Sequence, residues 1–204
     1  MLNIAVLISG GGTDLQSIID GVESGYLKNV NIKYVISDRK DAHGIERAKK
    51  HGIEALVFDR KEYKGELNKK LLDTLKGKVD LIVLAGFLSI IGSELVSEFP
   101  NRIINIHPSL IPSFCGKGMY GLKVHEAAIN YGVRFSGCTV HFVDENTDTG
   151  AIILQKVVPV KPEDTKEELQ QRILVEEHKA LPEAVKLISE GKVKVIDRKV
   201  YIKE

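Results

Sequence analysis

The sequence predicts an α/β fold, with a mostly parallel twisted sheet, helices on both of its faces and antiparallel additions in the C-terminal third. Apolar runs alternate with segments of helical periodicity from residue 2 to residue 106, and this alternation is typical of parallel strands joined by helical crossovers. Two longer strand-like segments then follow each other across a short polar connection, which favours antiparallel pairing. A chain of 204 residues fits one domain.

The first half of the chain supplies the alternating elements. Runs rich in Val, Ile and Leu predict strands at 2–8, 31–37, 54–58, 79–84 and 102–106. Helical periodicity lies between them, near 13–24, 43–51, 61–76 and 92–98. A loop rich in Pro and Gly then runs from Pro108 to about Tyr120 and leads to a helix near 121–131.

The second half supplies the additions. Strands are expected at 134–144 and 150–160, joined by the polar segment 144–149. Thr165 and Glu168 have the spacing of a capping box and predict a long helix that ends near Ser189. The tail reads as a hairpin of 193–196 and 199–202. No internal repeat or low-complexity linker is present, so one domain over 1–204 is expected.

Composition excludes several classes of function. The net charge is +1 and no long block of like charge occurs, which argues against a nucleic-acid partner. No apolar run approaches the ~18–20 residues that span a bilayer, and the start lacks the features of a signal peptide. We therefore expect no membrane partner and a cytoplasmic location. Two cysteines suggest no disulfide scaffold, and no metal-binding cluster is evident.

A glycine loop follows the first predicted strand and opens the first helix. Ser9-Gly10-Gly11-Gly12-Thr13 lets the backbone approach a ligand, and the unpaired N–H groups of a helix start favour an anion. The Lys of a phosphate-binding Walker loop is absent, and Leu15 stands where a dinucleotide loop has its third glycine. A phosphate monoester is the preferred ligand. A dinucleotide, with Asp38 as the ribose acid, and a turn without ligand remain alternatives.

Polar side chains gather where the fifth predicted strand ends. Asn105 and His107 are two residues apart, so they should project from the same side, and Pro108 stops the strand. Open α/β sheets bind ligands at this edge. Asn105 can donate to an oxygen that gains negative charge, and His107 can donate or act as general acid–base. The alternative is a purely structural role, in which both side chains form hydrogen bonds with buried backbone groups.

Asp148, in the connection between the two later strands, is the third candidate. A carboxylate near His107 would favour the imidazolium and relay a proton to solvent. Ser109 and Cys115 are the nearby nucleophiles, but Ser109 follows a proline in a turn and its hydroxyl is expected to bond backbone. Because no evident nucleophile remains, the residues suit direct attack of one substrate on a carbonyl of the other.

The chain resembles the folate-dependent phosphoribosylglycinamide formyltransferases over nearly its whole length. The resemblance rests on the glycine loop and on Leu84-Ala85-Gly86-Phe87, Asn105-Ile106-His107-Pro108-Ser109-Leu110, Thr139-Val140-His141-Phe142-Val143 and Asp148-Thr149-Gly150. It implies a Rossmann-like formyltransferase fold, with a phosphate-binding half (1–106) and a folate-binding and catalytic half (107–204). It also implies 10-formyltetrahydrofolate as cosubstrate, glycinamide ribonucleotide as acceptor, no metal, and a monomer or homodimer.

The resemblance also assigns residues. Asn105, His107 and Asp148 match the catalytic positions, and the positions that bind the ribonucleotide are Gly11, Gly12, Thr13, Asp14 and Glu177. Those expected to contact folate are Arg60, Leu88, Ser89, Ile90, Ile91, Asn105, Asp144, Glu145, Asn146 and Thr147. The chain departs from the family in several segments. These are Thr13-Asp14 where Ser-Asn is common, Ser89 where Arg is common, Phe114-Cys115-Gly116 in place of a frequent Pro-Gly, and a variant loop at Lys117-Gly118-Met119-Tyr120.

Two classes of rival function, other formyl-folate enzymes and a non-catalytic binding module, differ in what the site would do. Formyltetrahydrofolate hydrolases use a similar Asn, His and Asp with water, but they carry an N-terminal regulatory domain, whereas this sequence begins at its first strand. Formyltransferases acting on initiator tRNA carry a C-terminal RNA-binding domain for which 204 residues leave no room. A non-catalytic phosphosugar-binding module is the second rival, although pure binding has no need of the three polar residues.

Overall fold

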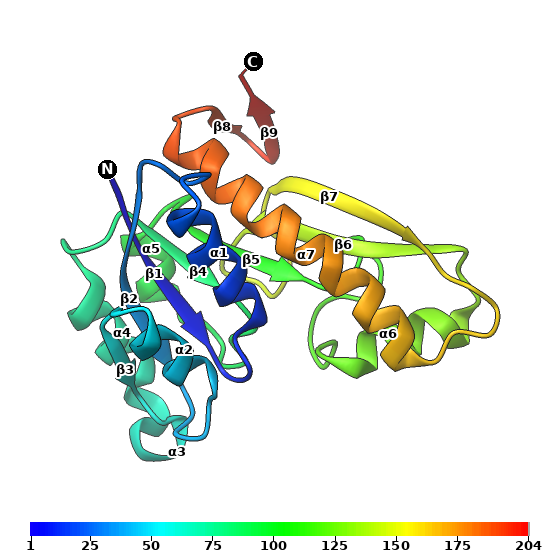
Figure 1. The fold of residues 1–204 in the computed structure, drawn as a ribbon, viewed down its shortest axis with the longest axis horizontal. Helices are drawn as coiled ribbons and strands as arrows, with labels where there is room; N and C mark the ends of the chain where they lie inside the picture. Colours follow the sequence, from blue (N-terminus) through cyan, green and yellow to red (C-terminus); the bar gives the residue numbers. More distant parts are fainter. Residues whose placement is uncertain (204) are drawn as a thin grey trace.

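The computed structural model describes residues 1–203 and confirms the predicted sheet. Seven strands lie in the order β3-β2-β1-β4-β5-β6-β7 (Figure 1). The first five are parallel: β1 (Leu2–Ile8), β2 (Val30–Ser37), β3 (Ala55–Val57), β4 (Leu81–Leu84) and β5 (Ile103–His107). The two antiparallel additions are β6 (Phe135–Phe142) and β7 (Ile152–Pro159).

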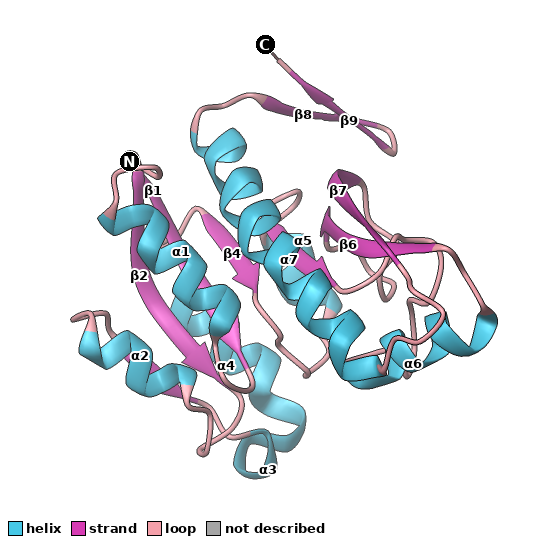
Figure 2. Cartoon of the chain, turned by 45° about the vertical axis from the view of Figure 1, so that its right-hand side comes forward, coloured by secondary structure: helices cyan, strands magenta, loops and turns pink. Residues whose placement is uncertain are grey.

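Helices cover both faces of the sheet, and they do so because side chains of each strand alternate between the faces. On one face, Ile4, Val6 and Ile8 of β1 pack in a cluster with α1 (Thr13–Glu23), α2 (Gly44–Lys50) and α7 (Lys166–Ser189). On the other face, Ala5 and Leu7 pack with α4 (Leu67–Leu75) and α5 (Ser93–Glu98). Figure 2 shows α1 and α7 side by side in front of the sheet.

The prediction of one continuous helix near 61–76 is wrong. The chain forms a short α3 (Arg60–Tyr63), a 3₁₀ turn at Lys64–Glu66 and then α4. Lys64 adopts φ 35° and ψ −112°, outside the helical region, so the i→i−4 hydrogen bonds cannot continue through it. Apolar periodicity does not report such a break, since Leu67, Leu71 and Leu75 of α4 keep their helical spacing.

The C-terminal third follows the prediction. Helix α6 (Leu122–Tyr131) precedes β6. The capping box at the start of α7 is formed: Thr165 N donates to Glu168 Oε2 at 2.8 Å, and Glu168 N donates to Thr165 Oγ1 at 3.2 Å. Strands β8 (Val193–Ile196) and β9 (Lys199–Ile202) pair as a separate hairpin beyond the end of α7 (Figure 2).

The strand order fixes where a ligand can bind. From β1 the chain proceeds outward to β3 and then returns to β4 on the other side of β1, so the connections after β1 and β4 diverge and leave a crevice at the carboxyl ends of these strands. No helix within residues 1–203 is both long enough and apolar enough to span a bilayer.

Candidate active site

A cavity of about 870 Å³ opens at this crevice and collects most of the predicted site residues. They come from segments that are far apart in the sequence: the starts of α1 and α3, the connection after β4, strand β5, the 144–149 connection and α7. The predicted residues that line the cavity are Thr13, Asp14, Arg60, Leu88, Ser89, Ile90, Ile91, Asn105, His107, Asp144, Glu145, Asn146, Thr147, Asp148 and Glu177. Gly11 and Gly12 do not line it.

Asp148 lies against His107, as the sequence predicted. Its Oδ2 is 3.6 Å from His107 Nδ1, and both side chains are at least nine-tenths buried. Asp148 has φ 58°, a left-handed conformation that Asp tolerates better than most residues. The Gly116 N–H donates to Asp148 Oδ2 at 2.8 Å. This backbone donor helps to hold the carboxylate in place.

The second ring nitrogen of His107 also faces an oxygen. His107 Nε2 lies 3.0 Å from the Phe114 carbonyl, which can only accept, so Nε2 carries a proton. Nδ1 then faces the Asp148 carboxylate. This separation of 3.6 Å is longer than a hydrogen bond. The geometry therefore holds the His107 ring between the Phe114 carbonyl and the Asp148 carboxylate.

His141 is a site residue that sequence reasoning gave no role. Its Nδ1 lies 2.8 Å from the Phe142 carbonyl, so its Nε2 is free to accept from Asn105 Nδ2 at 3.1 Å. Burial is the main reason that the pKa of His141 is lowered, which keeps the ring neutral. His141 thereby orients the Asn105 amide and leaves its second N–H for a ligand. The two residues are register partners between β5 and β6.

His125 of α6 is a third imidazole at the cavity; in the sequence it begins a His-Glu-x-x pattern like that of zinc proteases, which Ile129 leaves incomplete, so no role was expected for it. It is 1% exposed and lines the cavity. Its Nδ1 is buried with no hydrogen-bond partner in residues 1–203. Burial, followed by the charge of His107, lowers the pKa of His125 to about 4. The His125 ring is therefore neutral near pH 7 and adds no positive charge to the cavity.

The two rival nucleophiles are poorly placed for a covalent route. Ser109 Oγ donates to the Ser113 carbonyl at 2.6 Å, which confirms the predicted backbone bond. Cys115 Sγ donates to the Pro112 carbonyl at 3.3 Å. Burial and the nearby Asp148 raise the pKa of the Cys115 thiol, so the reactive thiolate is disfavoured.

The glycine loop depends on Gly12 for its shape. Gly12 has φ 71° and ψ 36° and immediately precedes α1. A Cβ at this position would lie 2.8 Å from Gly44 Cα, so α2 packs directly on the loop backbone. Arg47 of α2 donates through Nε to the Gly11 carbonyl at 2.8 Å. The loop is thus fixed by its neighbours, and its N–H groups keep one arrangement.

Replacing Gly12 with alanine is expected to lower the free energy of unfolding by about 1–3 kcal/mol, because a left-handed non-glycine residue is strained and the added Cβ meets backbone. Urea unfolding measures the change. Gly10→Ala is the matched control, since a Cβ at Gly10 meets no atom within 4 Å; its effect should stay within about 0.5 kcal/mol. An equal loss of unfolding free energy in Gly12→Ala and Gly10→Ala would contradict the conclusion that the loop depends on Gly12 for its shape.

The segment predicted to contact folate is fixed to the end of β1. Ser9 N donates to the Gly86 carbonyl at 3.1 Å, and Leu88 N donates to Ser9 Oγ at 2.8 Å. Leu88 and Ile90 expose large parts of their apolar side chains, 45% and 79% respectively. An apolar rim of this kind suits a flat heteroaromatic ligand.

Ser89 and Arg60 meet at Asp38, the residue considered as a ribose acid. Ser89 Oγ donates to Asp38 Oδ2, and Arg60 Nη1 lies 3.8 Å from the same oxygen. Asp38 is fully buried and does not line the cavity. It therefore anchors the two predicted folate residues, and nothing favours the dinucleotide alternative.

The 144–149 connection forms an internal turn. Asn146 N donates to Asp144 Oδ1 at 3.1 Å, and Thr149 Oγ1 donates to the same oxygen. Such side-chain bonds to nearby backbone are typical of Asp in turns. The turn places Asp148 toward His107 and leaves Glu145 and Asn146 exposed at the edge of the cavity.

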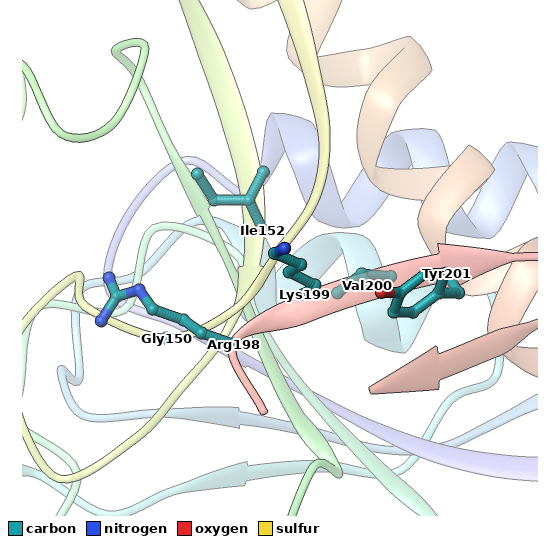
Figure 3. Close-up of a pocket in the computed structure, with 6 residues that line it drawn as sticks. All are labelled: Gly150, Ile152, Arg198, Lys199, Val200 and Tyr201. Carbon is teal, nitrogen blue, oxygen red and sulfur yellow. The ribbon is translucent and has the colours of Figure 1, made fainter. Parts of the chain in front are cut away.

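A second, smaller cavity of about 360 Å³ lies between β7 and the terminal hairpin. Figure 3 shows its lining: Gly150, Ile152, Arg198, Lys199, Val200 and Tyr201. None of these residues lines the larger cavity. Among the described residues, 1–203, no group of three or more His, Cys, Asp or Glu side chains is arranged to hold a metal ion.

Comparison with known proteins agrees with this arrangement. The profile of the formyl transferase family matches residues 2–185. The chain is 45% identical over 195 residues to a chloroplastic phosphoribosylglycinamide formyltransferase of Arabidopsis thaliana, a match covering 94% of this chain and 66% of that protein. The chain thus spans just under two thirds of that relative.

Two solved structures share the fold. Glycinamide ribonucleotide transformylase 1 from Symbiobacterium toebii is similar with a TM-score of 0.94 at 44% identity, covering 100% of this chain and 95% of that chain. A formyltetrahydrofolate deformylase from Pseudomonas syringae pv. tomato is similar with a TM-score of 0.86 at 26% identity, covering 100% of this chain and 66% of that chain. On the profile match and the 44% identity, the chain belongs to the formyl transferase family.

Proposed function

We infer that the chain transfers the formyl group of 10-formyltetrahydrofolate to the amine of glycinamide ribonucleotide, a step of purine biosynthesis. The observation that carries this inference is the convergence of Asn105, His107 and Asp148 in one cavity with the end of the glycine loop and with Leu88–Ile91. A phosphorylated amine and a formyl folate bound at these two sides would meet at the three polar residues. The similarity to glycinamide ribonucleotide transformylases supports the choice of substrates.

The reaction uses charge stabilisation and proton transfer. The amine nitrogen attacks the formyl carbon, and the carbonyl oxygen becomes an oxyanion that faces Asn105 Nδ2 and the His107 ring. Asp148, beside His107, accepts a proton from the attacking nitrogen through water. The oxyanion then re-forms the carbonyl while the bond from carbon to folate N10 breaks, and N10 takes up the proton that Asp148 had accepted, again through water. Holding both substrates in one cavity supplies further acceleration through proximity.

The remaining contacts position the substrates. The backbone of Gly11, Gly12 and Thr13 is proposed to hold the phosphate at the start of α1, where unpaired N–H groups and the helix dipole favour an anion. Glu177 is proposed to contact the ribose. The folate would lie along Leu88–Ile91, with Arg60 and the 144–147 turn at its edges.

One assay separates transfer from hydrolysis. Purified protein mixed with 10-formyltetrahydrofolate should release tetrahydrofolate only after glycinamide ribonucleotide is added, and formylglycinamide ribonucleotide should appear in equal amount. Absorbance measures the release of tetrahydrofolate, and chromatography measures the formylglycinamide ribonucleotide that is formed. Release at the full rate without the amine would instead assign the hydrolase activity. No turnover with tight ribonucleotide binding would favour the binding module.

A further inference from the structure

Thr139 of β6 lies beside His107 but outside the cavity. The two residues are register partners between β5 and β6. Thr139 is fully buried, and it does not line the cavity that holds the proposed catalytic residues. Because a substrate in that cavity cannot touch its hydroxyl, any influence of Thr139 on the reaction must pass through other residues.

The Thr139 hydroxyl binds the main chain of the loop that follows β5. Its Oγ1 donates to the Ser109 carbonyl at 2.7 Å and accepts from Ile111 N at 3.1 Å. Gln155 of β7, the register partner of Thr139, donates through Nε2 to Thr139 Oγ1 at 3.0 Å and to the Ile111 carbonyl at 3.1 Å. A hydroxyl has one proton and two lone pairs, so these bonds use every position that Thr139 offers.

The same loop contacts both members of the proposed catalytic pair further along the chain. The Phe114 carbonyl lies 3.0 Å from His107 Nε2, and Gly116 N donates to Asp148 Oδ2 at 2.8 Å. Phe114 is three residues beyond Ile111, a stretch of at most about 10 Å of chain. The point at which Thr139 holds the loop is therefore close to the point at which the loop holds His107.

A closed turn joins these two points. Ser113 N donates to the Leu110 carbonyl at 3.0 Å, and Ser109 Oγ donates to the Ser113 carbonyl at 2.6 Å. The turn ties its own ends together, so a shift of the main chain at 109–111 carries the Phe114 carbonyl with it.

We propose that Thr139 is a positioning residue, whose hydroxyl fixes this loop against His107 and Asp148. The Phe114 carbonyl then holds the His107 ring, and the Gly116 N–H holds the Asp148 carboxylate. The roles of these two side chains in the reaction rest on the proposed function. Their placement matters because a misplacement of about 1 Å can lower a rate by about 10²-fold.

Thr139→Val replaces the hydroxyl with a methyl group and keeps the branched shape. The buried Ser109 carbonyl and Ile111 N–H would lose their partner, and unpaired buried groups are costly enough to displace the loop. We expect kcat to fall by about 10–10²-fold. The KM of both substrates should change much less, since Thr139 does not line the cavity. Thr139→Ser keeps the hydroxyl and should restore most of the wild-type kcat.

Amide hydrogen exchange followed by NMR tests the loop without any substrate. The Gly116 N–H is held by Asp148, so its exchange should be faster in Thr139→Val than in wild type and close to wild type in Thr139→Ser. The amides of β1 serve as the reference, because they report on opening of the whole sheet.

Two further variants serve as comparisons. Ser136 is another buried residue of β6, but its Oγ has no hydrogen-bond partner in residues 1–203, so Ser136→Ala should match wild type in kcat and in Gly116 exchange. Gln155→Leu should lower kcat less than Thr139→Val does, because Gln155 is exposed and water can replace its bonds to the loop. If Thr139→Val does not fold, Gln155→Leu carries the comparison with Ser136→Ala.

The outcomes separate this role from the proposed function. Wild-type kcat in folded Thr139→Val would overturn the positioning role. Exchange at Gly116 that accelerates only in step with the amides of β1 would also overturn it, since Thr139 would then support the fold as a whole. Absence of formyl transfer by wild type would overturn the proposed function instead, and Gly116 exchange alone would then decide whether Thr139 fixes the loop.

Discussion

Asp148→Asn should lower kcat by about 10²–10⁴, the range that a positioned proton-transfer group contributes. The amide keeps the size of the carboxylate and can still accept from the Gly116 N–H, but it cannot take up the proton of the attacking amine. Single-turnover formation of formylglycinamide ribonucleotide measures the loss directly. The KM of both substrates should change much less, since the interaction is used in the transition state.

A double variant tests whether Asp148 and His107 act together. If they form one unit, Asp148→Asn combined with His107→Ala should cost about as much as the worse single change, and the effects should not multiply. Thermal unfolding of each variant shows whether the fold is retained. Near-normal turnover in folded Asp148→Asn would refute the proposed proton transfer.

Asn105→Leu is the second change with a large expected effect. It removes the amide that His141 orients, and loss of one oxyanion donor typically lowers kcat by about 10²–10³. Rapid-quench measurement of the chemical step would detect this. His141→Asn should show an intermediate loss, because the Asn105 amide remains but is less well oriented. A larger loss in His141→Asn than in Asn105→Leu would assign His141, and not Asn105, the direct contact.

The fold could be predicted because its signals are local. The apolar sequences of β1, β2 and β4 reflect strands that are buried on both faces of the sheet. Successive side chains of β1 belong alternately to the two clusters, as expected for a strand. Helix-capping residues are also local signals: the spacing of Thr165 and Glu168 correctly predicted where α7 begins. The break at Lys64 escaped prediction because a single backbone torsion changes no hydrophobic pattern.

The proposed catalytic residues were partly predictable for a related reason. Asn105 and His107 stand on β5 with alternate spacing and next to Pro108, so the sequence alone places them together. His141 and His125 contribute through the pairing of β5 with β6 and through the position of α6, which the local sequence does not encode. The joint attachment of Ser89 and Arg60 to Asp38 depends in the same way on packing between distant segments.

The loop beside the proposed catalytic residues is held through its main chain. His107 bonds the carbonyl of Phe114, and Asp148 accepts from the amide of Gly116. Both positions are constrained in other ways as well: Phe114 has φ 50° and packs against Tyr131, and Gly116 has φ 89°, a conformation that favours glycine. Cys115 lies between them and takes part in neither contact. A change of the Cys115 side chain should therefore leave the positions of His107 and Asp148 intact, whereas a change at Gly116 should disturb Asp148.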